Sequence, residues 1–139
     1  MWSDTLYYLQ WVGGLFVDLG CCLSDRGEPW SRTHRPFHCR VNPEWAAPAF
    51  DAASADYVCL ANNHVLDYEE VALRDTLDEP DDAGIARSGA GRALDEALEP
   101  AVVSTGSATV AIVAFTDNAP EYAVGCETAR NRSGRRSTA

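Results

Sequence analysis

The sequence predicts an α/β fold with a largely parallel sheet. Short apolar runs near Leu15, Tyr57, Ile85 and Val110 alternate with segments of helical character. This alternation is typical of parallel strands that are joined by helices. The chain has 139 residues, of which 46% are hydrophobic, so it is long enough for one domain with a buried core.

The first predicted elements are a short helix and a strand. Residues 5–11 are apolar with helical potential, and Gly13-Gly14 ends this segment. Leu15-Phe16-Val17 is predicted to form a buried strand that ends in Asp18-Leu19-Gly20. The polar stretch 24–35 is predicted to be a loop.

Two longer helices are predicted in the middle of the chain. Asn42 can cap the first, and Pro43 suits its first helical position. We expect this helix to bury Trp45, Ala49 and either Ala52 or Ala53. The second helix spans residues 69–83, and Pro80 is expected to kink or end it near Glu79. Its acidic face is predicted to be solvated and consists of Asp75, Asp78, Glu79, Asp81 and Asp82.

A glycine-rich turn follows the strand predicted at residues 85–88. Gly89-Ala90-Gly91 leads from this strand to a helix at Leu94–Leu98. The glycines also resemble half of a dinucleotide-binding fingerprint, but Leu94 stands where a third small residue is needed. We interpret the stretch as a tight turn, with a nucleotide-binding domain as the alternative.

The remaining predicted elements are a hairpin and a tail. Strands at residues 101–104 and 109–116 are predicted to pair through the turn at Gly106-Ser107. The second strand ends in the polar residues Thr116-Asp117-Asn118. Residues 126–139 are rich in arginine and are predicted to form a disordered tail.

The most informative stretch follows the buried strand predicted at Tyr57–Leu60. Asn62, Asn63, His64 and Asp67 come within a few positions of its end. In an open α/β sheet, ligands bind beyond the carboxyl ends of the strands. Asn and His suit a divalent metal, and His can transfer a proton near neutral pH. The alternative is a structural turn, in which Asn adopts a left-handed conformation and His caps the next helix.

Leu60–Tyr68, with the sequence Leu-Ala-Asn-Asn-His-Val-Leu-Asp-Tyr, resembles a motif of the CapA family of capsule or poly-γ-glutamate biosynthesis proteins. Further stretches that resemble this family are Cys22–Gly27, Phe37–Arg40, Ala72–Asp78, Asp82–Ile85, Gly89–Gly91, Glu96–Pro100 and Val110–Asp117. The resemblance implies a partial CapA-like domain at residues 1–125.

The resemblance also implies a calcineurin-like metallophosphoesterase fold, a layered α/β sandwich with a two-metal site at its strand ends. His64 would then be catalytic, and Asn63, His64 and Asp18 would be metal ligands. Asn62 and Asp67 would support these ligands. The implied cofactor is a divalent metal such as Mn²⁺, and the implied substrate is an anionic polymer or a phosphoester.

Two departures from the family pattern predict a degenerate site. The family has Asn-Leu-Glu where this chain has Asp18-Leu19-Gly20, so a metal-binding carboxylate is missing at Gly20. No His follows His64, and a two-metal mechanism needs more ligands than Asp18, Asn63 and His64 provide. We therefore expect a fragment of the family domain that binds a metal weakly. The alternative is a non-catalytic remnant or an interaction module of the same fold.

Charge and hydropathy limit the kinds of partner and the location that the sequence predicts. The chain has 21 acidic and 11 basic residues and a net charge of -10, which argues against nucleic acid. It contains no apolar run long enough to span a membrane. The start of the chain lacks the features of a signal peptide, so a cytoplasmic location is expected, although CapA-like proteins are often extracellular and membrane-anchored.

The five cysteines are predicted to be free thiols, because they are odd in number and have no regular spacing. Cys21 and Cys22 together with His34 and His38 suggest a zinc finger. Adjacent cysteines cannot serve as the separated pair that such a site needs, so structural thiols are the preferred interpretation.

Overall fold

The computed structural model describes residues 2–122, and its centre is a parallel sheet of three short strands. They are β1 (Phe16–Asp18), β4 (Tyr57–Cys59) and β5 (Ala86–Ser88), with β4 in the middle. Each strand overlaps one of the predicted apolar runs. The α/β fold with a parallel sheet is therefore confirmed.

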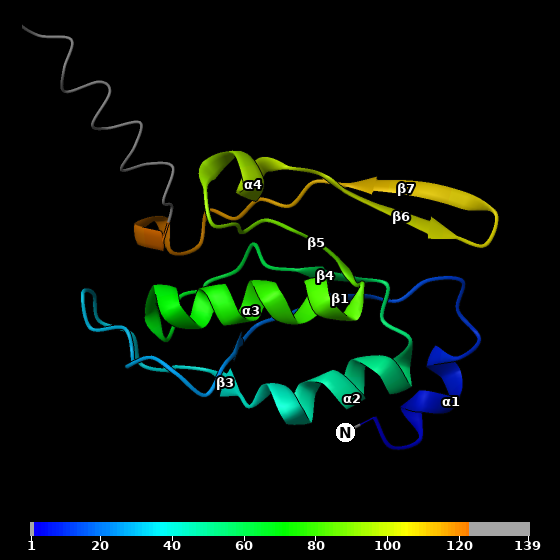
Figure 1. Cartoon of the computed structure of the whole chain (residues 1–139), viewed down its shortest axis with the longest axis horizontal. Helices are drawn as coiled ribbons and strands as arrows, with labels where there is room; N and C mark the ends of the chain where they lie inside the picture. Colours follow the sequence, from blue (N-terminus) through cyan, green and yellow to red (C-terminus); the bar gives the residue numbers. More distant parts are fainter. Residues whose placement is uncertain (1, 123–139) are drawn as a thin grey trace, which may run out of the picture.

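The other elements surround this sheet (Figure 1). In chain order they are α1 (Thr5–Leu9), β2 (Cys22–Leu23), β3 (Arg40–Val41), α2 (Pro43–Ala53), α3 (Glu69–Ala83), α4 (Leu94–Leu98), β6 (Ala101–Thr105), β7 (Ala108–Ile112) and the 3-10 turn η1 (Pro120–Tyr122). The short strands β2 and β3 pair in parallel beside α3, and β6 and β7 form an antiparallel hairpin. Figure 1 shows α2 and the hairpin on opposite sides of β4.

The alternation of side chains along β4 separates two hydrophobic clusters. Val58 and Leu60 are buried in the larger cluster, which includes Leu73 and Leu77 of α3. Tyr57 faces the other way and packs in a smaller cluster with residues of the hairpin. Successive strand residues point to opposite faces, so β4 is covered on both sides.

The hairpin corrects one expectation about the sheet. The turn at Gly106-Ser107 pairs the two strands as predicted, with Val103 opposite Val110. However, the strand containing Val110 is antiparallel and belongs to a separate two-stranded sheet, and it ends at Ile112 rather than at residue 116. An apolar run does not specify its partner, and here the short connection between the strands favours a hairpin.

The helix α2 begins as predicted but buries a different face. The Asn42 side chain accepts a hydrogen bond from the Glu44 amide at 2.8 Å, which caps the helix. The expected burial of Trp45 is wrong, because this side chain is 55% exposed. The helix instead turns Ala46 and Ala53 inward, where small side chains allow close contact with neighbouring elements such as α3.

The helix α3 has the predicted bounds and does not end near Glu79. It continues through Pro80 to Ala83 and ends at Gly84, which has a φ of 70°. Pro80 is in the last turn, so its missing amide removes one hydrogen bond close to the helix end. The Pro80 ring is buried, and its carbonyl accepts a hydrogen bond from the Ile85 amide at 2.8 Å, which closes the helix.

The acidic face of α3 is solvated as predicted at Asp78, Asp81 and Asp82, and three of its five carboxylates also pair with arginines. The ion pairs are Arg26 with Asp75, Arg92 with Asp78, and Arg87 with Asp81. Both oxygens of Asp81 lie 2.8 Å from nitrogens of Arg87. These arginines come from segments on either side of α3 in the sequence, which the periodicity of one helix cannot reveal.

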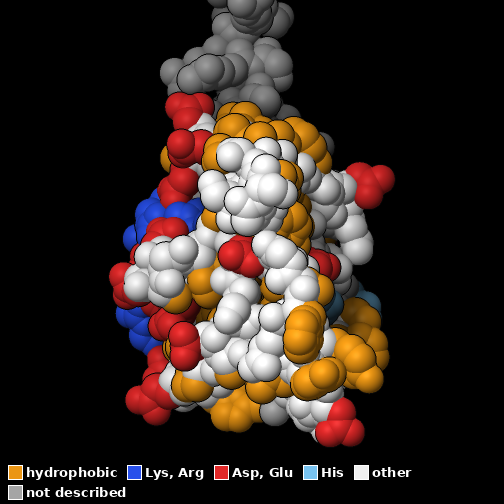
Figure 2. Space-filling model, turned by 90° about the vertical axis from the view of Figure 1, so that its right-hand side faces the viewer, with side chains coloured by type: hydrophobic (Ala, Val, Ile, Leu, Met, Phe, Trp, Pro, Cys, Tyr) orange, Lys and Arg blue, Asp and Glu red, His pale blue; other side chains and the backbone are white. Residues whose placement is uncertain are grey.

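Several large hydrophobic side chains remain on the surface. The end of the molecule that carries α1 and the hairpin tip faces the viewer in Figure 2, and hydrophobic side chains gather in its lower part. Three aromatic residues of the α1 region, Tyr7, Tyr8 and Trp11, are 63%, 69% and 77% exposed.

Among residues 2–122, no helix has the length and apolar character needed to cross a membrane. The tail predicted at residues 126–139 lies outside the described residues.

Candidate functional site at the carboxyl edge of the sheet

Asn62 links the carboxyl ends of two parallel strands. Its Nδ2 atom donates to Oδ1 of Asp18 at 3.0 Å and to the Leu19 carbonyl at 2.9 Å. Asp18 is the last residue of β1 and pairs with Cys59, the last residue of β4. The parallel register therefore brings residues that are far apart in the sequence to one edge of the sheet.

A hydrogen-bonded turn carries the chain from β4 into α3. Oδ1 of Asn62 accepts a hydrogen bond from the His64 amide at 3.0 Å, and the Asp67 amide donates to the His64 carbonyl at 3.2 Å. Asn side chains favour such local turns. The turn and the polar groups therefore occur together, but the predicted details of the turn are wrong, because neither Asn is left-handed and His64 does not cap α3.

His64 is oriented by a fully buried carboxylate. Its Nδ1 atom lies 2.6 Å from Oδ2 of Asp67, which has 0% exposure. The same oxygen accepts a hydrogen bond from the Cys39 amide at 2.7 Å, and Oδ1 accepts one from the Tyr122 hydroxyl at 3.3 Å. Because Asp67 accepts through the Nδ1 proton, Nε2 is the His64 nitrogen left to bind a ligand or move a proton. Burial and the charge of Asp67 raise the pKa of Tyr122, which keeps its hydroxyl protonated as the donor.

Asn63 contacts a residue that the sequence did not assign to the site. Its Oδ1 atom accepts a hydrogen bond from Nδ2 of Asn118 at 3.1 Å. Asn118 belongs to the stretch Thr116–Asn118, which the sequence marks only as polar groups after a strand. That signal could have suggested a residue near the site, but the contact with Asn63 depends on the path of the chain after β7.

Cys39 is a second residue that the sequence did not place at the site. Cys39, His64 and Asp67 each offer one potential ligand atom, and these atoms all lie within 4.8 Å of one another. Cys39 precedes β3 and is brought here because β3 pairs with β2. No spacing in the sequence points to this proximity.

Two of the predicted metal ligands, Asp18 and Asn63, accept hydrogen bonds from other side chains of the chain. Oδ1 of Asp18 contacts Asn62, and Oδ1 of Asn63 contacts Asn118, so amide groups of the chain already occupy both atoms. Asp18 is not a member of the ligand group formed by Cys39, His64 and Asp67, which is the one group of this kind found among residues 2–122. Two ions held about 3.5–4 Å apart need a larger set of ligands.

Gly20 leaves room at this edge. A Cβ atom built at Gly20 would meet no other atom within 4 Å. A larger side chain therefore fits where the family pattern has glutamate.

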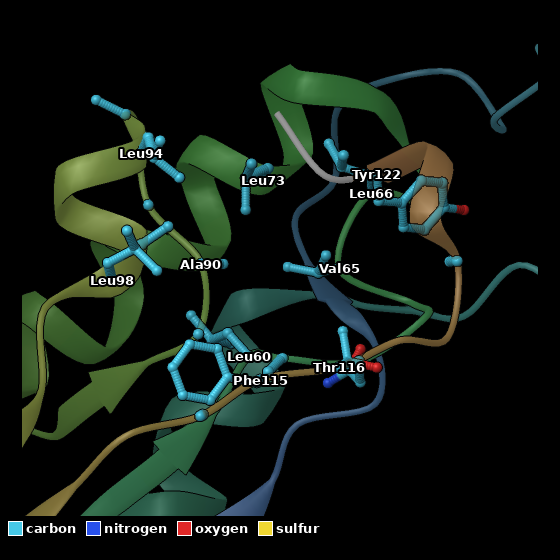
Figure 3. Close-up of a pocket in the computed structure, with 18 residues that line it drawn as sticks. Leu60, Val65, Leu66, Leu73, Ala90, Leu94, Leu98, Phe115, Thr116 and Tyr122 are labelled. Carbon is cyan, nitrogen blue, oxygen red and sulfur yellow. The ribbon is translucent and has the colours of Figure 1, made fainter. Parts of the chain in front are cut away.

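An apolar pocket of about 280 Å³ lies beside the polar edge (Figure 3). Figure 3 shows Leu94 and Leu98 of α4 across the pocket from Val65 and Tyr122. Asn62 is one of the few polar residues in its lining, and none of the described residues that line it is charged. The described residues of the pocket lining include no His, Cys, Asp or Glu, the groups best suited to bind a metal or move a proton, and such groups lie at the hydrogen-bonded edge instead.

The fold and this edge define an α/β domain with its polar groups at the carboxyl ends of parallel strands. The family model of the bacterial capsule synthesis protein PGA_cap matches residues 1–138. The chain belongs to this family, and the resemblance to capsule biosynthesis proteins is confirmed. No curated protein matches the chain.

Proposed function

We propose that the protein acts in capsule or poly-γ-glutamate synthesis through a degenerate metallophosphoesterase-type site at the carboxyl edge of the sheet. The observation that carries this proposal is the family match, which extends over residues 1–138. The position of Asn62, Asn63 and His64 after β4 supports the location of the site.

In this proposal Asp18, Asn63 and His64 bind one divalent ion such as Mn²⁺. Only Asp18 contributes an anionic oxygen, and hard cations generally need several such ligands. A dissociation constant of about 10⁻⁴ M or weaker is therefore expected. Because Asp67 fixes the ring through Nδ1, Nε2 is the one His64 nitrogen left, so it serves either as the metal ligand or, when it carries a proton, as the donor to the substrate.

An anionic polymer or phosphoester needs a local positive charge on this acidic chain, and Arg40 supplies one. Arg40 is exposed, lies 4.1 Å over the ring of Tyr68, and has no carboxylate partner among residues 2–122. Its other contacts are backbone carbonyls at 3.3 and 3.4 Å. We expect Arg40→Gln to weaken binding of polyglutamate, whereas Arg92→Gln, which removes an arginine already paired with Asp78, has little effect.

The metal part of the proposal is tested by titrating the purified chain with Mn²⁺ in a calorimeter. We expect one weak site that Asp18→Asn and His64→Ala both remove, and that the exposed control Asp51→Asn leaves intact. Gly20→Glu should raise the affinity, because the added carboxylate has open space beside Asp18. Tight binding of two ions by the unmodified chain would contradict the degenerate site.

The alternative function is a non-catalytic interaction module of the same fold. It is favoured by the internal pairing of the polar edge, in which Asp18 contacts Asn62 and Asn63 contacts Asn118. Complete absence of Mn²⁺ binding by both the unmodified chain and Gly20→Glu would support this alternative.

A further inference from the structure

Cys39 lies next to the pair formed by His64 and Asp67, and Cys21 is close enough that, besides burial, the charges of Cys39 and Asp67 raise the pKa of its thiol. The register of β2 and β3 pairs Cys22 with Arg40, and the Cys22 amide donates to the Cys39 carbonyl at 2.9 Å. The preceding residues in this register are Cys21 and Cys39. Residues paired in a parallel register point to the same face, so Cys21 lies near Cys39, although its sulfur is not one of the ligand atoms grouped within 4.8 Å of one another.

The thiol of Cys39 is also close to His64 and Asp67. The potential ligand atoms of these three residues lie within 4.8 Å of one another. The four ligands of a tetrahedral zinc ion are about 3.3–3.8 Å apart, as follows from metal–ligand distances of about 2.0–2.3 Å. The distances of the Cys39 sulfur to the other two ligand atoms need only a small decrease to reach this geometry. The distance between Nδ1 of His64 and Oδ2 of Asp67 must instead increase by about 1 Å from 2.6 Å.

We propose that Cys39, His64 and Asp67, with Cys21 as the fourth ligand, bind one soft divalent cation such as Zn²⁺. This site goes beyond the proposed function: it shares His64 with the strand-edge site but uses neither Asp18 nor Asn63. Two sulfurs, one nitrogen and one oxygen form a ligand set that selects Zn²⁺ over Mn²⁺, because thiolates prefer soft metals.

The surroundings already hold these ligands in place. Asp67 is fully buried and is fixed by the Cys39 amide and the Tyr122 hydroxyl. The carbonyl of His64 accepts a hydrogen bond from the Cys22 thiol at 3.3 Å, which ties the histidine backbone to β2. Fixed ligands lower the cost of assembling a metal site. A cation here would bind Nδ1 of His64, whose proton would move to Nε2, and would displace the protons of both thiols, so binding releases the thiol protons into the medium.

The test uses Co²⁺ as a spectroscopic probe on the full, reduced and metal-free chain. Co²⁺ bound to thiolate gives a sulfur-to-metal charge-transfer absorption that oxygen and nitrogen ligands do not produce. We expect one equivalent of Co²⁺ to develop this band and one equivalent of Zn²⁺ to abolish it. Cys39→Ser should reduce the band to half or less, because Cys21 keeps one thiolate, and it should weaken Zn²⁺ binding at least about 100-fold. Cys21→Ser should reduce the band to about half, because one of two thiolates is lost.

The matched control is Cys59→Ser, which removes a half-buried thiol that packs in the hairpin cluster. It should leave the band unchanged, and circular dichroism should establish that each variant is folded. A chain without the band, or a folded Cys39→Ser variant that keeps it at full intensity, overturns the proposal, and an unchanged band in Cys21→Ser overturns the role of Cys21.

Asp18→Asn separates this site from the proposed function. It should abolish Mn²⁺ binding at the strand edge but leave the Co²⁺ band at full intensity. If Mn²⁺ does not bind to the unmodified chain while the Co²⁺ band appears, the proposed function fails and the thiol site stands. The opposite pattern overturns the thiol site alone.

Discussion

Oδ2 of Asp67 accepts hydrogen bonds from both Nδ1 of His64, at 2.6 Å, and the amide of Cys39, at 2.7 Å. Asp67 therefore ties the turn after β4 to the segment before β3, and its burial leaves no water to replace either donor. One buried carboxylate thus serves both the orientation of His64 and the stability of the fold.

The first prediction concerns this carboxylate. Asp67→Asn should lower the free energy of unfolding by about 1–3 kcal/mol, because the amide cannot accept as many of these hydrogen bonds. Urea denaturation measures the change. The exposed control Asp51→Asn should stay within about 0.5 kcal/mol of the unmodified chain. Equal stability of Asp67→Asn and the unmodified chain would show that the contacts of Asp67 do not stabilise the fold.

A second prediction concerns the turn after β5. Gly89 has a φ of +95°, and a Cβ atom there would lie 2.6 Å from Cβ of Ala61 and 2.7 Å from its amide nitrogen. Gly89→Ala should destabilise the protein by about 2 kcal/mol or more, through backbone strain and this clash. Gly13→Ala is the control, because its Cβ would meet nothing within 4 Å. Thermal unfolding should show a lower midpoint for Gly89→Ala only.

A third prediction concerns acid stability. Hydrogen bonding from Arg26, helped by Ser24, lowers the pKa of Asp75 from its ordinary value of 3.8. A carboxyl group with a lowered pKa in the folded state stabilises the fold above its unfolded pKa, and this stability is lost as the pH falls through the folded pKa. Asp75→Asn should therefore be less stable than the unmodified chain at pH 7. The difference should shrink as the pH falls below about 4. A difference in unfolding free energy that does not change with pH would refute the ion pair.

The sequence predicts local structure well because the signals are local. Asn42 and Pro43 specify the start of α2, and Gly84 in a left-handed conformation ends α3. Pro80 shows the limit of such rules, because a buried ring near a helix end is tolerated where an isolated helix would break.

The candidate site is only partly predictable for the opposite reason. The stretch Asn62–His64 is recognisable by its motif and its position after a strand. The contact of Asn118 with Asn63 and the closeness of Cys39 to His64 join residues far apart in the sequence. They depend on the path of the chain after β7 and before β3. Side-chain types and periodicity carry no information about such contacts.

A fourth prediction concerns the exposed aromatic side chains of the α1 region. Tyr7 stacks edge-on against Tyr8 with ring centres 5.5 Å apart, and it also contacts Trp11 at 6.1 Å. We expect the purified protein to bind a hydrophobic dye and to self-associate in light scattering, because such clusters attract apolar surfaces. Trp11→Ser should reduce both signals. A monodisperse monomer without dye fluorescence would show that these aromatic side chains do not drive self-association.

The proposal of a degenerate site is tested most directly by measuring the turnover of a generic phosphodiester with saturating Mn²⁺. The unmodified chain is expected to give no hydrolysis above the buffer rate, with His64→Ala indistinguishable from it, since the described ligands cannot hold two ions. Gly20→Glu serves as a third arm, because it adds the carboxylate that the family pattern places beside Asp18. Hydrolysis by the unmodified chain that His64→Ala abolishes would contradict the account and establish a working metallophosphoesterase site.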